Sequence, residues 1–158
     1  RDGSLARGGH VDNECLETAA SVPWFKHPPP KSARRNEFDE ILSLECMNKC
    51  SPEDRLATVT ALSAKVMYDF YRRECGDFPS PDAIWVSGGG ANNLTLMEYC
   101  NTFFSPLPVR SIEERGIPAA MRVPLALGLT VHLCLNRTYC RVNGKKRTLS
   151  SLAKWLFP

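Results

Sequence analysis

Apolar residues recur at helical spacing through the middle of the chain. The clearest segment opens with Ser51-Pro52-Glu53-Asp54, an N-cap followed by a proline at the first helical position and two acids in the first turn. Arg72 and Arg73 stand at the opposite end, where basic side chains are favoured. One apolar stripe lies between these ends, at Leu56, Val59, Leu62, Val66 and Phe70. The pattern predicts a long helix whose stripe packs against the rest of the protein.

Weaker patterns predict the other elements. The helical period predicts further helices over residues 13–22, 36–44, 93–103 and 119–135. Two short apolar runs predict strands, one that begins at Ile84 and one over residues 107–109. Among the connections, we expect a hairpin-like turn over residues 1–9, a rigid extended segment over 24–32 and a loop over 111–118.

This order of elements indicates an α/β fold, with a small sheet covered by helices. A chain of 158 residues, of which 43% are apolar, suits one globular domain. Two to four strands, however, leave sheet edges exposed and cannot cover this many amphipathic helices. The chain also begins without methionine, in a polar and glycine-rich stretch. We therefore expect the fold to be incomplete and the chain to be cut from a longer one.

The main candidate site is the glycine run that follows the strand at Ile84. Gly88, Gly89 and Gly90 lack a Cβ, so the backbone can turn sharply there and approach a ligand closely. The helix that follows would present free N–H groups and the positive end of its dipole, which suits a phosphate or a polar sugar edge. The run matches neither G-x-G-x-x-G nor the P-loop motif. A tight turn with no ligand accounts for the local residues equally well.

Charge and hydropathy argue against two classes of partner. Twenty Lys and Arg residues stand against seventeen Asp and Glu residues, and the resulting charge of +3 is scattered, so a nucleic acid is not indicated. No apolar run is long enough to span a bilayer, so no membrane association is expected. The N-terminal stretch lacks the apolar core of a signal peptide. We therefore expect a cytoplasmic protein.

The cysteines and histidines do not form a recognisable metal or catalytic site. None of the seven cysteines belongs to a C-x-x-C pair, and Cys46 and Cys50 lack a second pair of ligands at zinc spacing. We interpret the cysteines as reduced thiols of a cytosolic protein. His10, His27 and His132 stand apart from any recognisable nucleophile, so they are given no catalytic role.

Lys31 and Arg35 flank the proline-rich connection. A stiff turn of this kind can present two cations to a phosphate, so we predict these residues as substrate or phosphate contacts. A solvated rim explains them as well, and the local sequence does not distinguish the two interpretations.

Several segments, in order along the chain, carry a family resemblance. Asp2-Gly3-Ser4-Leu5-Ala6-Arg7-Gly8-Gly9 is similar to D-G-x-x-A-x-x-G, and Trp24-Phe25 with Pro28-Pro29-Pro30-Lys31-Ser32 is similar to Y-F…P-P-K-S-T-G-R-E-x-F. Ser51-Pro52-Glu53-Asp54 is similar to S-P-x-D-x-x-A-T-L, Gly88-Gly89-Gly90-Ala91 to G-G-G-A-x-N, and Gly116-Ile117-Pro118-Ala119 to G-I-P-A-D-x-x-E-A-L-A. Over residues 1–135 the chain resembles the C-terminal half of the anhydro-N-acetylmuramic acid kinase family, in the actin-like sugar kinase superfamily.

The resemblance implies one lobe of an actin-like ATPase or sugar kinase fold. Family members use ATP and a divalent cation, Mg²⁺, to phosphorylate the 6-oxygen of a 1,6-anhydrosugar, and water opens the anhydro bond. The glycine-rich loop of this lobe lies against the nucleotide, so the implied nucleotide-binding residues are Gly88, Gly89, Gly90 and Asn93. The general base and the family's phosphate loop lie upstream of the matched half, so the fragment alone is expected to be inactive. A homodimer is implied for the full-length protein.

The chain departs from the family pattern in three places. The acidic residue of the G-I-P segment falls on Val123, and Ala33-Arg34-Arg35-Asn36 stands where the family has T-G-R-E. Residues 137–158 are basic and unrelated, so we divide the chain into a kinase lobe over residues 1–136 and a divergent tail of unknown role. Three alternatives to the muramic acid enzyme stay open: a levoglucosan kinase, a catalytically silent nucleotide-binding or regulatory fragment, and a fragment that does not fold stably.

Overall fold

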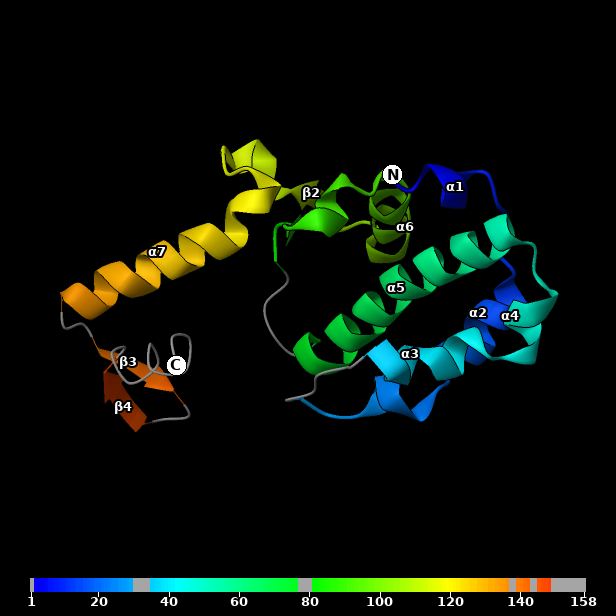
Figure 1. The fold of residues 1–158 in the computed structure, drawn as a ribbon, viewed down its shortest axis with the longest axis horizontal. Coiled ribbons are helices and arrows are strands. Elements are labelled where there is room, and N and C mark those ends of the chain that lie inside the picture. Colours follow the sequence, from blue (N-terminus) through cyan, green and yellow to red (C-terminus); the bar gives the residue numbers. More distant parts are fainter. Residues whose placement is uncertain (1, 30–34, 77–80, 137–138, 143–144, 149–158) are drawn as a thin grey trace.

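The computed structural model describes residues 2–29, 35–76, 81–136, 139–142 and 145–148, and helices make up most of this part (Figure 1). The central element is α5, Pro52–Cys75. Its most extensive neighbours are α6, Leu94–Phe104, then α1, Ser4–Arg7, and α2, Asn13–Ala20. Figure 1 shows α5 running through the body of the molecule, with α2, α3 and α4 on one side and α6 on the other.

The remaining helices are short, except the last. The α-helices among them are α3, Arg35–Leu42, α4, Glu45–Lys49, and α7, Arg122–Leu135. The 3-10 helices are η1, Pro23–Lys26, η2, Gly89–Asn92, η3, Ile112–Arg115, and η4, Ala119–Met121. The helices expected over residues 13–22, 36–44 and 93–103 are therefore confirmed, and the one expected over 119–135 opens with η4 and continues as α7.

Each sheet among the described residues has two strands. Strand β1, Ile84–Val86, pairs in parallel with β2, Val109–Ser111, and Ile84 lies opposite Val109. Strands β3, Tyr139–Val142, and β4, Lys145–Thr148, form an antiparallel pair. The small parallel sheet beside several helices confirms the α/β class. The actin-like lobe stays a prediction.

The start of α5 follows the sequence prediction, and so does most of the predicted stripe, because Leu62 is buried and Val59 and Val66 pack against a core cluster. Ser51 accepts a hydrogen bond from the Asp54 N–H at 3.1 Å, so it is the N-cap. The buried residues are mostly small, namely Ala57, Thr58, Ala61, Leu62 and Ala64. Leu56 is 45% exposed, so its place in the predicted stripe was wrong. Small side chains let neighbouring helices approach α5 closely, and this brings their backbones near its surface.

Two clusters of buried side chains form the core. The larger cluster lies among α2, α3, α4 and α5 and consists of Cys15, Leu16, Ala19, Val22, Ile41, Met47, Ala61 and Leu62. The smaller cluster lies between α5, α6 and β2 and consists of Ala64, Cys100, Phe104 and Val109. Both clusters take residues from α5, so this helix joins them.

A disulfide links α2 to the beginning of α4. Cys15 and Cys46 are 31 residues apart in sequence, and their Cα atoms are 5.4 Å apart, within the range that a disulfide requires. The interpretation of all seven cysteines as reduced thiols was therefore wrong for this pair. Cys50, Cys75 and Cys100 are free thiols, and burial raises the pKa of the Cys100 thiol.

Four local expectations need correction. The described part of the hairpin-like turn expected over 1–9, residues 2–9, does not form one, because Ser4–Arg7 is a short helix. Pro23 stands at the start of a 3-10 turn, so η1 replaces the first part of the extended segment expected over 24–32. The second strand lies two residues later than expected. The expected loop over 111–118 contains η3, whose first turn is capped by the Ser111 hydroxyl.

Helix α7 extends away from the body of the molecule (Figure 1). Its apolar residues are largely exposed, including Val123, Leu125, Leu129 and Leu135. A helix that is apolar around most of its circumference is typical of the interior of a larger assembly. Within the described ranges, no helix is both long and apolar enough to cross a membrane.

Acid should remove one contribution to the stability of the α1–α5 junction. The Asp54 carboxylate accepts the His10 N–H at 2.6 Å, and this hydrogen bond, followed by the one involving Ser51, lowers the pKa of Asp54 below its ordinary value near 3.8. A lowered pKa gives stability that is complete above the unfolded value and is lost as the pH falls through the folded value. We expect the wild-type advantage over Asp54→Asn to be full above about pH 5 and to shrink below pH 4.

Urea midpoints measured between pH 2.5 and pH 7 test this expectation. Asp69→Asn is the control, because it removes another carboxylate from α5 and so matches the change in net charge. A difference between wild type and Asp54→Asn that stays constant down to pH 2.5 would contradict the assignment.

Candidate functional site

The glycine run forms a tight turn between β1 and α6. Gly88 has a φ of 82°, in the left-handed region that only glycine adopts readily. Its N–H donates to the carbonyl oxygen of Ala119 at 2.9 Å. This hydrogen bond ties the turn to η4, so the G-I-P-A segment and the glycine run are parts of one local structure.

Two backbone donors of the turn face no protein acceptor. Gly88 and Gly90 use their carbonyl oxygens for the N–H groups of Ala91 and Asn93, both at 3.1 Å. The N–H groups of Gly89 and Gly90, by contrast, donate to no group in the described part of the chain. Gly89 is exposed, and a Cβ added to it would meet no atom within 4 Å. The turn therefore offers two N–H donors that no described protein group accepts, one of them at the exposed Gly89, an arrangement that suits an anion.

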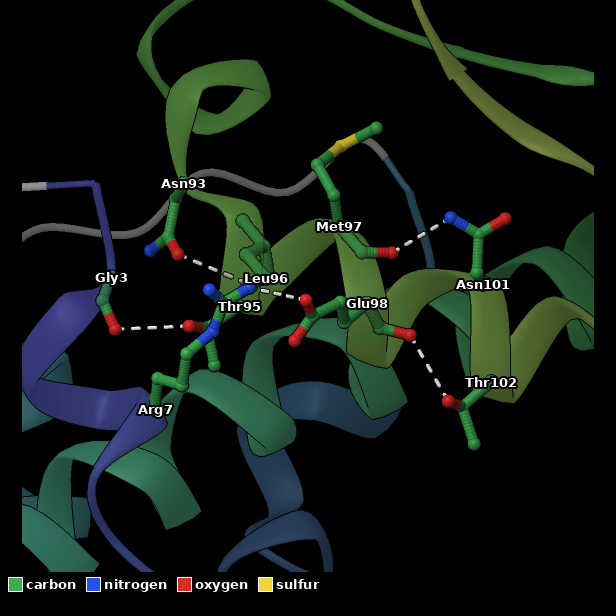
Figure 2. A network of polar contacts seen from close by, with 9 residues as sticks. All are labelled: Gly3, Arg7, Asn93, Thr95, Leu96, Met97, Glu98, Asn101 and Thr102. Carbon is green, nitrogen blue, oxygen red and sulfur yellow. Dashed lines mark hydrogen bonds and ion pairs between the residues drawn. The ribbon is translucent and has the colours of Figure 1, made fainter.

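The first turn of α6 offers less than the sequence predicts. The Leu96 N–H donates to Asn93 Oδ1 at 3.0 Å, so Asn93 is the N-cap of α6 (Figure 2). The Leu94 N–H donates to the carbonyl oxygen of Asp2 at 3.2 Å. These partners occupy two of the donors expected to face a ligand. That Asn93 contacts the nucleotide stays a prediction, and its carboxamide nitrogen is the group left to do so.

The N-terminal segment packs directly against this cap. The Thr95 hydroxyl donates to the carbonyl oxygen of Gly3 at 2.9 Å, and Arg7 forms an ion pair with Glu98 (Figure 2). Gly3 has a φ of 80°, and a Cβ added to it would overlap Asn93 Oδ1. The Asp2-Gly3 turn thus supports the start of α6, a role that the sequence analysis missed. The glycine after the aspartate was the available signal, because it allows both the left-handed φ and the close approach.

The described structure does not show where the two cations predicted on the proline-rich connection lie relative to this site. Lys31 lies outside the described residues. Arg35 begins α3, and its side chain lies outside the described part. Their role as substrate or phosphate contacts stays a prediction.

The glycine run does not line either of two hollows in the described chain, although Leu96, which lies beside Gly90, lines the second of them. One hollow of about 720 Å³ is lined by Tyr68, Tyr71 and Phe104 beside the smaller core cluster. Another, of about 780 Å³, is apolar and is lined by residues that include Trp24 and Phe70. Neither hollow includes the glycine run.

A protein-built metal cage is not part of this site. Among the described residues, no group of three or more His, Cys, Asp and Glu side chains is arranged to hold a metal ion.

Comparison with known proteins identifies a family over nearly the whole chain. The sequence model of anhydro-N-acetylmuramic acid kinase matches residues 1–150. The kinase of this name from Salinibacter ruber is 32% identical over 142 residues, which are 87% of this chain and 36% of the relative. The kinase from Roseobacter denitrificans is 37% identical over 77% of this chain and 30% of its own length. The chain therefore spans about a third of the length of these relatives.

Proposed function

This chain belongs to the anhydro-N-acetylmuramic acid kinase family, and from that premise we propose that it forms the nucleotide side of an ATP-dependent anhydrosugar kinase. The observation that carries the proposal is the pair of unpartnered N–H groups at Gly89 and Gly90, in an exposed turn that a phosphate can approach closely. The proposed reaction transfers the γ-phosphoryl group of ATP to the 6-oxygen of 1,6-anhydro-N-acetylmuramic acid, while water adds to C1 and the C1–O6 bond breaks, so that the products are ADP and the sugar 6-phosphate.

The residues of the turn fit the demands of ATP. Catalysis of phosphoryl transfer consists mainly of positioning and charge stabilisation, and backbone N–H groups supply both without moving. The hydrogen bond from the Gly88 N–H to the Ala119 carbonyl oxygen anchors the start of the turn. Mg²⁺ would neutralise the phosphate oxygens and would be held chiefly by them and by water.

We propose that the remaining catalytic groups come from a part of the full-length protein outside residues 1–158. The proposal draws the general base and most contacts to the sugar from the part of the relatives' length that this chain does not match. It also includes a cytoplasmic location and a homodimer for a full-length member. A silent nucleotide-binding protein would share the same turn, so nucleotide binding and turnover have to be measured separately.

Replacing Gly89 with alanine should weaken ATP binding without weakening the fold. The new Cβ meets no protein atom within 4 Å, and no left-handed conformation at Gly89 opposes it. It would instead occupy the space that a phosphate needs. We expect the Kd for Mg-ATP, measured by calorimetry on the full chain, to rise about tenfold, the effect of losing roughly 1.4 kcal/mol.

Gly128→Ala is the matched control, because its Cβ also meets nothing within 4 Å and it lies in α7, away from the turn. It should leave the Kd unchanged. Equal ATP affinities in wild type and Gly89→Ala, or no binding by the wild-type chain, would contradict the proposed site. An assay for phosphorylation of the anhydrosugar then separates a kinase from a silent binding protein.

A further inference from the structure

Arg122 lies beside the glycine turn although it is 34 positions later in the sequence than Gly88. It is the first residue of α7 and follows η4, whose Ala119 carbonyl holds the Gly88 N–H. The Arg122 Cζ is the nearest atom to the position that a Gly88 Cβ would take, at 4.0 Å. The fold therefore brings a guanidinium group next to the turn through a backbone hydrogen bond between two segments.

The guanidinium of Arg122 has no protein partner within the described ranges. Arg7, Arg73 and Arg110 form ion pairs with glutamates, and Arg115 lies over the ring of Trp85 at 4.5 Å. No comparable ion pair, hydrogen bond or ring contact is present at Arg122 in this part of the protein. Its side chain is exposed, so its donors are available to a ligand.

The nearby acidic group is already engaged elsewhere. Glu113 accepts the N–H of Ala119 at 3.1 Å, and it does not pair with Arg122. In the family motif G-I-P-A-D-x-x-E, the two acidic positions on either side of Arg122 fall on Ala120 and Val123 in this chain. Arg122 itself falls on an unspecified position of that motif, so the family resemblance assigns it no role. Among the described residues, no ion pair therefore neutralises the guanidinium of Arg122.

We propose that Arg122 binds a phosphate group of the nucleotide held at the glycine turn, an inference that rests on the proposed function. The turn carries the N–H groups of Gly89 and Gly90, which no described protein group accepts, and the guanidinium of Arg122 lies beside Gly88 in the same turn, so all of these groups donate. A ligand must therefore offer acceptors. Phosphate oxygens match the planar fork of an arginine in geometry and charge, whereas the hydroxyl edge of a sugar does not supply a negative charge.

The test compares ATP with adenosine, which has the same base and ribose but no phosphate. In calorimetric titrations of the full chain, Arg122→Ala should raise the Kd for Mg-ATP about tenfold, because a charge-assisted hydrogen bond to a phosphate is lost, and should leave the Kd for adenosine unchanged, because adenosine has no phosphate. Arg122→Lys should recover part of the loss, since it keeps the charge and loses the fork. The wild-type Kd for ATP should also rise more steeply with salt than that of Arg122→Ala.

Arg110→Ala is the control, because it removes an exposed positive charge that already pairs with Glu114 at 3.6 Å, and it should bind ATP as the wild type does. If Arg122→Ala binds ATP with wild-type affinity while Gly89→Ala is weakened, this inference fails and the proposed function stands. Equal losses for ATP and adenosine in Arg122→Ala would also overturn the phosphate contact. If the wild-type chain binds no ATP, the proposed function itself fails.

Discussion

Replacing Gly9 with alanine is expected to lower the free energy of unfolding by about 3 kcal/mol, at the upper end of the usual cost of overpacking. A Cβ at this position would overlap the carbonyl group of Glu53 and lie 2.7 Å from the N atom of Asp54. Both neighbours are backbone atoms at the start of α5. They cannot rotate away as a flexible side chain could, so the two segments have to separate.

That separation would weaken further contacts of the same junction. His10 donates its N–H to Asp54, and Asp12 donates its N–H to the buried hydroxyl of Thr58 at 3.1 Å. Urea denaturation monitored by circular dichroism measures the loss. Gly8→Ala is the matched control, because its Cβ would meet only the Leu5 carbonyl oxygen at an ordinary 3.6 Å. Similar stabilities for Gly8→Ala and Gly9→Ala would contradict the close approach of these two segments.

Replacing Met47 with alanine should also cost about 3 kcal/mol, within the range found when a large buried side chain is truncated. Met47 has an exposed fraction of 0% and belongs to the larger core cluster. Truncation removes its apolar contacts and leaves a cavity among α2, α4 and α5. The Met47 carbonyl oxygen also accepts the Nε–H of Arg55 at 2.7 Å, so α4 is held to α5 by its backbone and the cavity cannot close easily.

Met67→Ala makes the same chemical change at a position that is 44% exposed on α5. We expect it to change the stability by less than about 0.5 kcal/mol, as most surface substitutions do. If both variants unfold with the same m-value, their urea midpoints give the difference in their free energies of unfolding. A cost below about 1 kcal/mol for Met47→Ala would mean that this part of the core is loosely packed.

The parts of the structure that local sequence predicts are those with local causes. Ser51 and Pro52 define the start of α5 through contacts within one turn, and a helix after Asn93 follows from the same kind of signal. The strand at Ile84 and the glycine turn were likewise predicted from adjacent residues. In each case the residues that determine the conformation lie within a few positions of one another.

The features that sequence reasoning missed depend on contacts between distant segments. The pairing of Cys15 with Cys46 requires α2 and α4 to meet, and no spacing rule predicts that meeting. Leu56 fits the apolar period of α5 but faces solvent, because small residues make up the buried face. Packing partners decide which face of a helix is buried, and periodicity alone does not identify those partners.

The candidate site depends both on adjacent residues and on contacts between distant segments. The glycine run was predicted from its own residues, together with the idea that its donors face a ligand. The structure assigns the first donors of α6 to Asp2 and Asn93 and leaves those of Gly89 and Gly90 available. The position of Arg122 beside the turn depends on the hydrogen bond from Gly88 to Ala119, between residues 31 positions apart in sequence. Local patterns therefore locate the site, and tertiary contacts determine which groups can act in it.

Helix α5 also has a consequence for how this part of the protein melts. Ala61 and Leu62 belong to the larger core cluster and Ala64 to the smaller one, so a single helical turn contributes to both. The whole helix is about 36 Å long at the usual rise per residue. Fraying that reaches this turn would remove support from both clusters together. The two halves of the body therefore behave as one cooperative unit, and neither can open as an independent foldon.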